Sequence, residues 1–114
     1  MKKITVATIK SIVRNGGATI TREGVRVVLR SGYQVSKQDL YILPVADFCK
    51  EHLATALSLL SRRCEYVGVW IDNGLAYIDI SCRVSTKYEA MNLGRSLNQL
   101  SILRWRDGEC LAVV

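Results

Sequence analysis

Histidine and proline each occur once in this chain of 114 residues, and the sequence contains no run of 18 apolar residues. Because nucleophilic triads and imidazole acid–base sites need a histidine with an orienting partner, the lone His52 argues against both. A single proline and the lack of low-complexity tracts predict one domain, residues 1–114, without a linker. The missing apolar run excludes a transmembrane helix. Lys10 interrupts the early apolar residues too soon for a secretory signal, so we expect a cytoplasmic protein.

The chain also lacks the patterns of a metal site and of a phosphate-binding loop. Its cysteines lie 15, 18 and 28 positions apart, at 49, 64, 82 and 110, which is too far for a zinc knuckle. We expect them to be reduced, with Cys82 and Cys110 buried as small apolar side chains. Gly16-Gly17 follows an expected helix, whereas a phosphate loop follows a strand. The sequence therefore predicts no metal, no cofactor, no small-molecule substrate and no enzymatic activity.

Positive charge is concentrated near the start of the chain. The first 37 residues hold eight of the sixteen basic residues and one acidic residue, whereas the whole chain has a net charge of +6. The rest of the chain is therefore close to neutral. Such segregation is typical of proteins that bind a polyanionic partner. The eight basic residues are Lys2, Lys3, Lys10, Arg14, Arg22, Arg26, Arg30 and Lys37.

A short helix and a hairpin are predicted within this basic segment. Thr5 can cap a helix with apolar residues at helical spacing, which Asn15 and the two following glycines end. Strands at 18–22 and 25–30 then flank a two-residue turn at Glu23-Gly24. That turn places Ile20 opposite Val27. The other face of the hairpin would then carry Thr19, Thr21, Arg26, Val28 and Arg30.

A longer helix is predicted from Val45, because Pro44 suits a first turn and an apolar stripe follows at 45, 49, 53, 56, 57 and 60. Two short strands, at 33–35 and 40–43, are expected before it.

The second half of the chain predicts two more hairpins separated by a helix. Asn73-Gly74 joins strands at 66–72 and 75–80. A helix from Thr86 to about Leu97 is followed by strands at 100–105 and 109–113, with Arg106 facing Glu109. We therefore predict an α+β domain, with a mostly antiparallel sheet of about six strands in hairpins, packed by one long helix and two shorter helices.

The central hairpin should carry aromatic side chains on one face. Its register places Tyr66, Trp70 and Tyr77 on the side away from the apolar face of the hairpin. A second layer of core is the favoured interpretation, and a protein interface or a surface that stacks bases are the alternatives. Asp79 shares this face, and an enzyme centred on Asp79 and His52 would require both residues in one pocket.

The basic residues predict a polyanion site. Lys10 and Arg14 lie four positions apart, hence on one side of the first helix. If helix and hairpin pack together, these two residues join Arg26 and Arg30 in a strip that reaches several phosphates. Lys2, Lys3 and Lys37 would support this strip. The alternative is a solvated face whose charges protect an edge strand.

A further pattern runs from Tyr66 to Trp105, about a third of the chain. Its residues are Gly68, Trp70, Asp72, Gly74, Tyr77, Asp79, Ser81, Ala90, Leu93-Gly94, Asn98-Gln99 and Ile102. On these residues the segment resembles the C-terminal half of small uncharacterised proteins of bacteriophages and integrated mobile elements. Arg104-Trp105-Arg106 stands where that family usually has an acidic residue.

The resemblance implies a context rather than a reaction, because the family has no established activity. Small phage proteins without catalytic groups often act by binding, for example as anti-CRISPR or other host-defence inhibitors. We therefore expect a non-enzymatic protein in the cytoplasm of a bacterial host that engages nucleic acid or a host nucleoprotein complex. The alternatives are a sequence-nonspecific DNA- or RNA-binding accessory protein, and an interaction module or homodimer that uses the aromatic face.

Overall fold

The computed structural model describes residues 4–61 and 64–113 and has an α+β fold. Seven antiparallel strands form one sheet in the order β2-β1-β4-β5-β3-β6-β7, one strand more than the sequence suggested. The elements are α1 (Val6–Arg14), β1 (Gly17–Ile20), β2 (Arg26–Val27), β3 (Tyr33–Pro44), the 3-10 helix η1 (Val45–Asp47), α2 (Lys50–Ser58), β4 (Glu65–Asp72), β5 (Leu75–Val84), α3 (Lys87–Ser96), β6 (Ser101–Arg104) and β7 (Glu109–Ala112).

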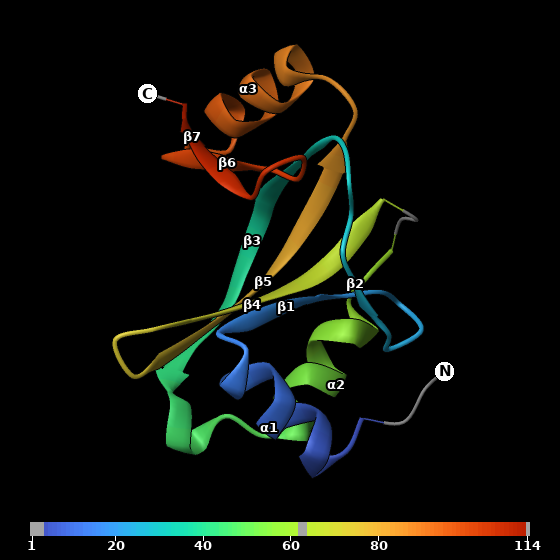
Figure 1. Ribbon diagram of the computed structural model, residues 1–114, viewed down its shortest axis with the longest axis vertical. Coiled ribbons are helices and arrows are strands. Elements are labelled where there is room, and N and C mark those ends of the chain that lie inside the picture. Colours follow the sequence, from blue (N-terminus) through green and yellow to red (C-terminus); the bar gives the residue numbers. More distant parts are fainter. Residues whose placement is uncertain (1–3, 62–63, 114) are drawn as a thin grey trace.

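Two hydrophobic cores lie on the same face of the sheet. Helices α1 and α2 cover the larger one, in which Ile12 and Leu53 pack against strand residues such as Ile78. Helix α3 covers the smaller one with β6 and β7, and Val84 packs against it. Because side chains alternate along a strand, Ile78 and Val84 lie on one face of β5. The helices sit at opposite ends of the sheet (Figure 1), and the buried hydrophobic residues of α1, α2 and α3 all belong to these two cores.

The predicted long helix is wrong, because the chain is extended where that helix should continue. After η1, Phe48 and Cys49 have ψ angles of 121° and 172°, so the nine-residue α2 begins only at Lys50. The backbone N–H of Cys49 donates to Nδ1 of His52 at 3.1 Å, which caps α2. The break also buries Phe48 in the larger core. The three α-helices therefore have similar lengths.

The first hairpin has a different register from the predicted one. Its loop has three residues rather than two, because the N–H of Thr21 donates to the carbonyl of Val25 at 2.8 Å and Gly24 adopts a φ of +82°. Such a loop ends in a left-handed residue that glycine favours. Val27 consequently lies opposite Thr19, and Arg26 lies opposite Ile20. The predicted register, in which Ile20 lies opposite Val27, is therefore wrong.

Of the other strand predictions, one is confirmed and two differ from the structure. The Asn73-Gly74 hairpin is confirmed with its register, since Trp70 lies opposite Tyr77. The two short strands expected at 33–35 and 40–43 form one strand, β3, with two irregularities in its pairing to β5. In the last hairpin a four-residue loop places Arg104, not Arg106, opposite Glu109.

Candidate functional site

Helix α1 exposes the first pair of basic residues. Thr5 caps the helix by accepting a hydrogen bond from the N–H of Thr8 at 3.2 Å. The helical spacing then brings Lys10 and Arg14 to one side, and both are exposed. They border a groove of about 410 Å³ between α1 and the segment around η1. The lining residues are Val6, Ile9, Lys10, Val13, Arg14, Val45 and Phe48.

The basic residues of the hairpin region lie elsewhere. Arg26 is exposed on β2, the short strand at one edge of the sheet, and Arg30 is exposed in the connection to β3. Arg26 lines a second hollow, which shares no lining residue with the groove beside α1. The structure therefore places Lys10 and Arg14 beside one groove. The four predicted contact residues, Lys10, Arg14, Arg26 and Arg30, do not surround a single cavity.

Lys37 has an internal role rather than the expected supporting one. Its Nζ lies 2.6 Å from Oε2 of Glu65, whose side chain is 5% exposed. Ser61 donates its backbone N–H to the other carboxylate oxygen of Glu65 at 2.8 Å. The charge of Lys37 thus serves to balance a buried carboxylate. Lys2 and Lys3 lie outside the described residues.

The cations of α1 and of the first hairpin region remain free to meet an external anion. Within residues 4–61 and 64–113, the only other ion pairs join Arg104 to Asp107 and to Glu109, at 2.7 and 2.8 Å. Arg104 holds the pKa of the Asp107 carboxyl at about 2, mainly through their hydrogen bond. In the same part of the chain, no carboxylate pairs with the set Lys10, Arg14, Arg26 and Arg30.

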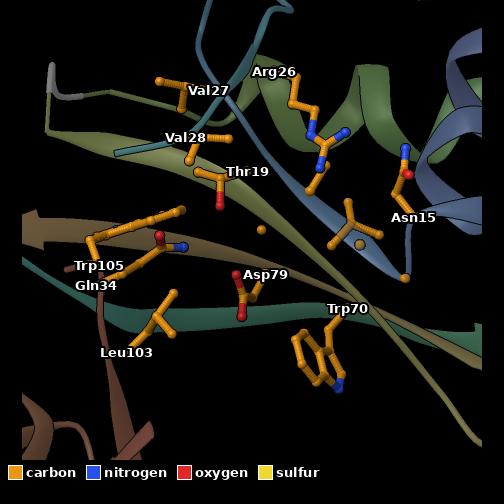
Figure 2. A pocket seen from close by; sticks show the side chains of 15 residues that line it. Asn15, Thr19, Arg26, Val27, Val28, Gln34, Trp70, Asp79, Leu103 and Trp105 are labelled. Carbon is orange, nitrogen blue, oxygen red and sulfur yellow. The ribbon is translucent and has the colours of Figure 1, made fainter. Parts of the chain in front are cut away.

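The face of the sheet opposite the helices carries the aromatic residues. Trp70 is 63% exposed, and Tyr66 and Tyr77 are half-buried. The favoured interpretation as a second core layer is therefore wrong for Trp70, whereas the half-buried Tyr66 and Tyr77 leave it open for their rings. Next to them is the second hollow, in which Asp79 points inward between Trp70 and Gln34 (Figure 2).

Asp79 is an unusual carboxylate on this face. Its cross-strand neighbour is Gly68, and a Cβ atom there would lie 2.5 Å from Oδ1 of Asp79. Burial raises the pKa of Asp79 from 3.8 to about 6, and the charge of Asp39 acts in the same direction. The Ser36 hydroxyl and the backbone of Gly68 oppose this rise by stabilising the ionised form. At neutral pH the carboxylate is ionised but poorly solvated.

Three polar residues beside Asp79 were not predicted from the sequence. Gln34 donates its side-chain N–H to Oγ of the buried Ser81 at 2.5 Å, and its Oε1 atom is buried without a partner. Ser36 and Trp105 also hold buried polar atoms without partners. Gln34 and Ser36 come from β3, and Trp105 follows β6. The alternation of polar residues on β3 at 34 and 36 was the one available signal.

The histidine and the cysteines do not complete this site. His52 packs against Tyr41 and Phe48 on the helix-covered face, so it does not share a pocket with Asp79. Sγ of Cys64 lies 3.1 Å from Sγ of the buried Cys82, whereas Cys110 is exposed, contrary to expectation. No cluster of three potential metal-ligating side chains occurs among the described residues.

No helix in the described ranges is both long and apolar enough to cross a membrane. Comparison of the chain with family models gives no match, and comparisons with curated proteins and with solved structures give no significant match.

Proposed function

We propose that this protein is a non-enzymatic binding protein that engages nucleic acid, free or within a nucleoprotein complex, through its basic N-terminal helix and hairpin. The observation that carries the proposal is a set of exposed cations that pair with no carboxylate of residues 4–61 and 64–113: Lys10, Arg14, Arg26 and Arg30. Guanidinium and ammonium groups in this state can neutralise phosphates and release counterions. Lys37 is left out of the proposed contact because Glu65 already neutralises it.

The biological setting is proposed from the resemblance alone. A phage or mobile-element protein that binds the nucleic-acid channel of a bacterial defence complex would act as an anti-CRISPR-like inhibitor in the host cytoplasm. A plain DNA- or RNA-binding accessory protein is the alternative. The two differ in one assay: only a direct inhibitor keeps its effect on purified host machinery when no free nucleic acid is bound.

The test is a salt titration of binding to fluorescent single- and double-stranded DNA and RNA. We expect micromolar or tighter affinity that falls steeply with salt. The double variants Lys10→Ala/Arg14→Ala and Arg26→Ala/Arg30→Ala should each lower the slope of log affinity against log salt by roughly 2 on duplex DNA. Absence of binding at low salt would overturn the proposal.

A matched control removes two cations at the other end of the molecule. Lys87 and Arg95 are exposed on α3, far from α1 in Figure 1. The Lys87→Ala/Arg95→Ala variant changes the net charge by the same amount but should change affinity and salt slope much less. Equal losses in all three double variants would mean that net charge, rather than a defined surface, drives binding.

A second candidate function rests on the exposed ring of Trp70. An indole that is 63% exposed beside Tyr77 is typical of a protein interface. Under this alternative the face would bind a protein partner or a second copy of the chain. Sedimentation of the wild type and of Trp70→Ala tests it, because a dimer through this face should dissociate in the variant.

A further inference from the structure

The open face of the sheet contains a hollow of ligand size. Its volume is about 330 Å³, at the small end of the range for ligand pockets. Strands β1 to β6 all contribute to its walls, which are mostly apolar around a few polar groups. Figure 2 shows Asp79 near the centre of the hollow, with Trp70 on one side and Gln34 and Trp105 on the other. Thr19 and Arg26 line the wall that faces Asp79 from β1 and β2. This composition is typical of a small-ligand site.

Buried polar atoms without partners are concentrated at this hollow. In the part of the chain that the structure describes, there are four such side-chain atoms: Gln34 Oε1, Ser36 Oγ, Asp79 Oδ1 and Trp105 Nε1. Three of them belong to residues that line the hollow, and the Ser36 hydroxyl acts on the Asp79 carboxylate. Folded proteins leave few such atoms unpaired, and a bound ligand is one way to satisfy them.

The unpaired atoms define what a ligand must offer. Gln34 Oε1 and the ionised Asp79 carboxylate accept hydrogen bonds, whereas the indole N–H of Trp105 donates one. The Gln34 amide is oriented by the bond from its N–H to Ser81 at 2.5 Å. A matching ligand therefore presents two N–H donors and an acceptor. The Watson–Crick edge of guanine has this pattern, with donors at N1 and N2 next to the acceptor O6.

Two further groups suit the rest of a nucleotide. The exposed indole of Trp70 provides a flat apolar surface at the rim, and every base can stack on such a ring. Arg26 lines the opposite wall, and no carboxylate of the described residues pairs with it. A guanidinium that pairs with no carboxylate can bind a phosphate. Both groups favour a nucleotide over a neutral ring.

We propose that this hollow binds one unpaired guanine of a single-stranded nucleic acid, with Trp70 stacked on the base, Asp79 and Gln34 accepting from its edge, and Arg26 on the phosphate. The inference rests on the proposed function, since it names the nucleotide that the nucleic-acid-binding protein selects. It adds a preference that the free cations of α1 do not supply, because phosphate contacts carry no base information.

The experiment compares three fluorescent RNA hexamers that differ at one position: all uridine, one guanosine, and one inosine. Inosine lacks the exocyclic amine of guanosine and thus one donor. We expect the guanosine hexamer to bind about tenfold more tightly than the uridine hexamer, and inosine to lose most of that gain. Binding of the guanosine hexamer should quench tryptophan fluorescence, because Trp70 and Trp105 both line the hollow.

Variants separate the hollow from the basic helix. Trp70→Ala should weaken binding of the guanosine hexamer about tenfold, and Trp70→Phe should restore most of it because a ring remains. Asp79→Asn turns an acceptor partly into a donor and should remove the preference for guanosine over uridine. As a control, Lys10→Ala/Arg14→Ala should weaken all three hexamers equally and leave the preference intact.

Failure of the guanine site and failure of the proposed function give different results. Equal affinity for the three hexamers, with no effect of Trp70→Ala, would overturn the guanine site and leave the proposed function standing. No binding to any hexamer or duplex would overturn the proposed function, and the inference with it. If Trp70→Ala dissociates a dimer without changing the base preference, the ring belongs to an interface between copies and its stacking role is overturned.

Discussion

The Asp79→Asn substitution is expected to stabilise the protein at neutral pH and to have little effect near pH 4. Burial raises the pKa of the Asp79 carboxyl from 3.8 to about 6. The folded protein therefore binds this proton more tightly than the unfolded chain, and ionisation opposes folding. The difference of about two pH units, at 1.36 kcal/mol each, corresponds to roughly 3 kcal/mol.

The sign of this effect sets the pH window. Below pH 3.8 the carboxyl is protonated in both states, so the wild type carries no penalty. As the pH rises toward 6, the unfolded chain ionises first and the wild type loses stability. Above about pH 7 the full penalty of roughly 3 kcal/mol is present, and it is absent in the variant at every pH.

The assay is urea unfolding at several pH values between 4 and 8, followed by tryptophan fluorescence. With an m-value of about 1.5 kcal/mol/M for a small domain, the variant should unfold at about 2 M more urea than the wild type at pH 7. Asp72→Asn is the control, since it removes an exposed carboxylate from the same hairpin. A difference between Asp79→Asn and the wild type that stays constant from pH 4 to pH 8 would refute the reasoning.

Lys37→Ala should lower the free energy of unfolding by about 2 kcal/mol, because the buried Glu65 carboxylate loses its ion pair with the Nζ atom of Lys37; a loss below about 0.5 kcal/mol would contradict this. Gly17→Ala should destabilise measurably in the same assay, because Gly17 has a φ of +144° and a Cβ would meet the carbonyl of Val69. Hydrogen peroxide should oxidise the thiols of Cys64 and Cys82 to a disulfide with release of two waters. Peptide mapping after alkylation would detect it.

Helix caps and tight turns could be predicted from the sequence, because they depend on a few neighbouring residues. Thr5 caps α1 as expected, and the Asn73-Gly74 turn sets the register of β4 and β5, because both depend on residues within a few positions. The long helix failed for a tertiary reason: the predicted apolar stripe is buried only from Leu53 to Leu60, and the chain extends at Phe48 to bury that ring in the core. Spacing alone does not distinguish a continuous helix from two segments that face the same core.

Part of the candidate site could likewise be predicted from the sequence, and part of it could not. The exposed basic residues could be read from composition, and the shared face of Trp70 and Asp79 followed from the hairpin register. The hollow itself could not be predicted, because β3 lies between β5 and β6 in the sheet and brings Gln34 beside Leu103. The bulges in β3 also shift which of its residues reach Asp79. Pairings between strands distant in sequence leave no local pattern.

The buried polar groups that cost folding free energy lie on the open face of the sheet, and this is the strongest argument for a function there. The helix-covered cores bury apolar side chains, and none of the four unpaired buried polar atoms of the described residues belongs to them. The open face instead holds a carboxylate whose ionisation opposes folding, beside an amide oxygen and an indole N–H that lack partners. An apolar residue at position 79 would remove a penalty of roughly 3 kcal/mol, which is large against the total stability of a small domain. Stability does not account for such an arrangement, and this is why we propose a ligand that supplies the missing hydrogen bonds.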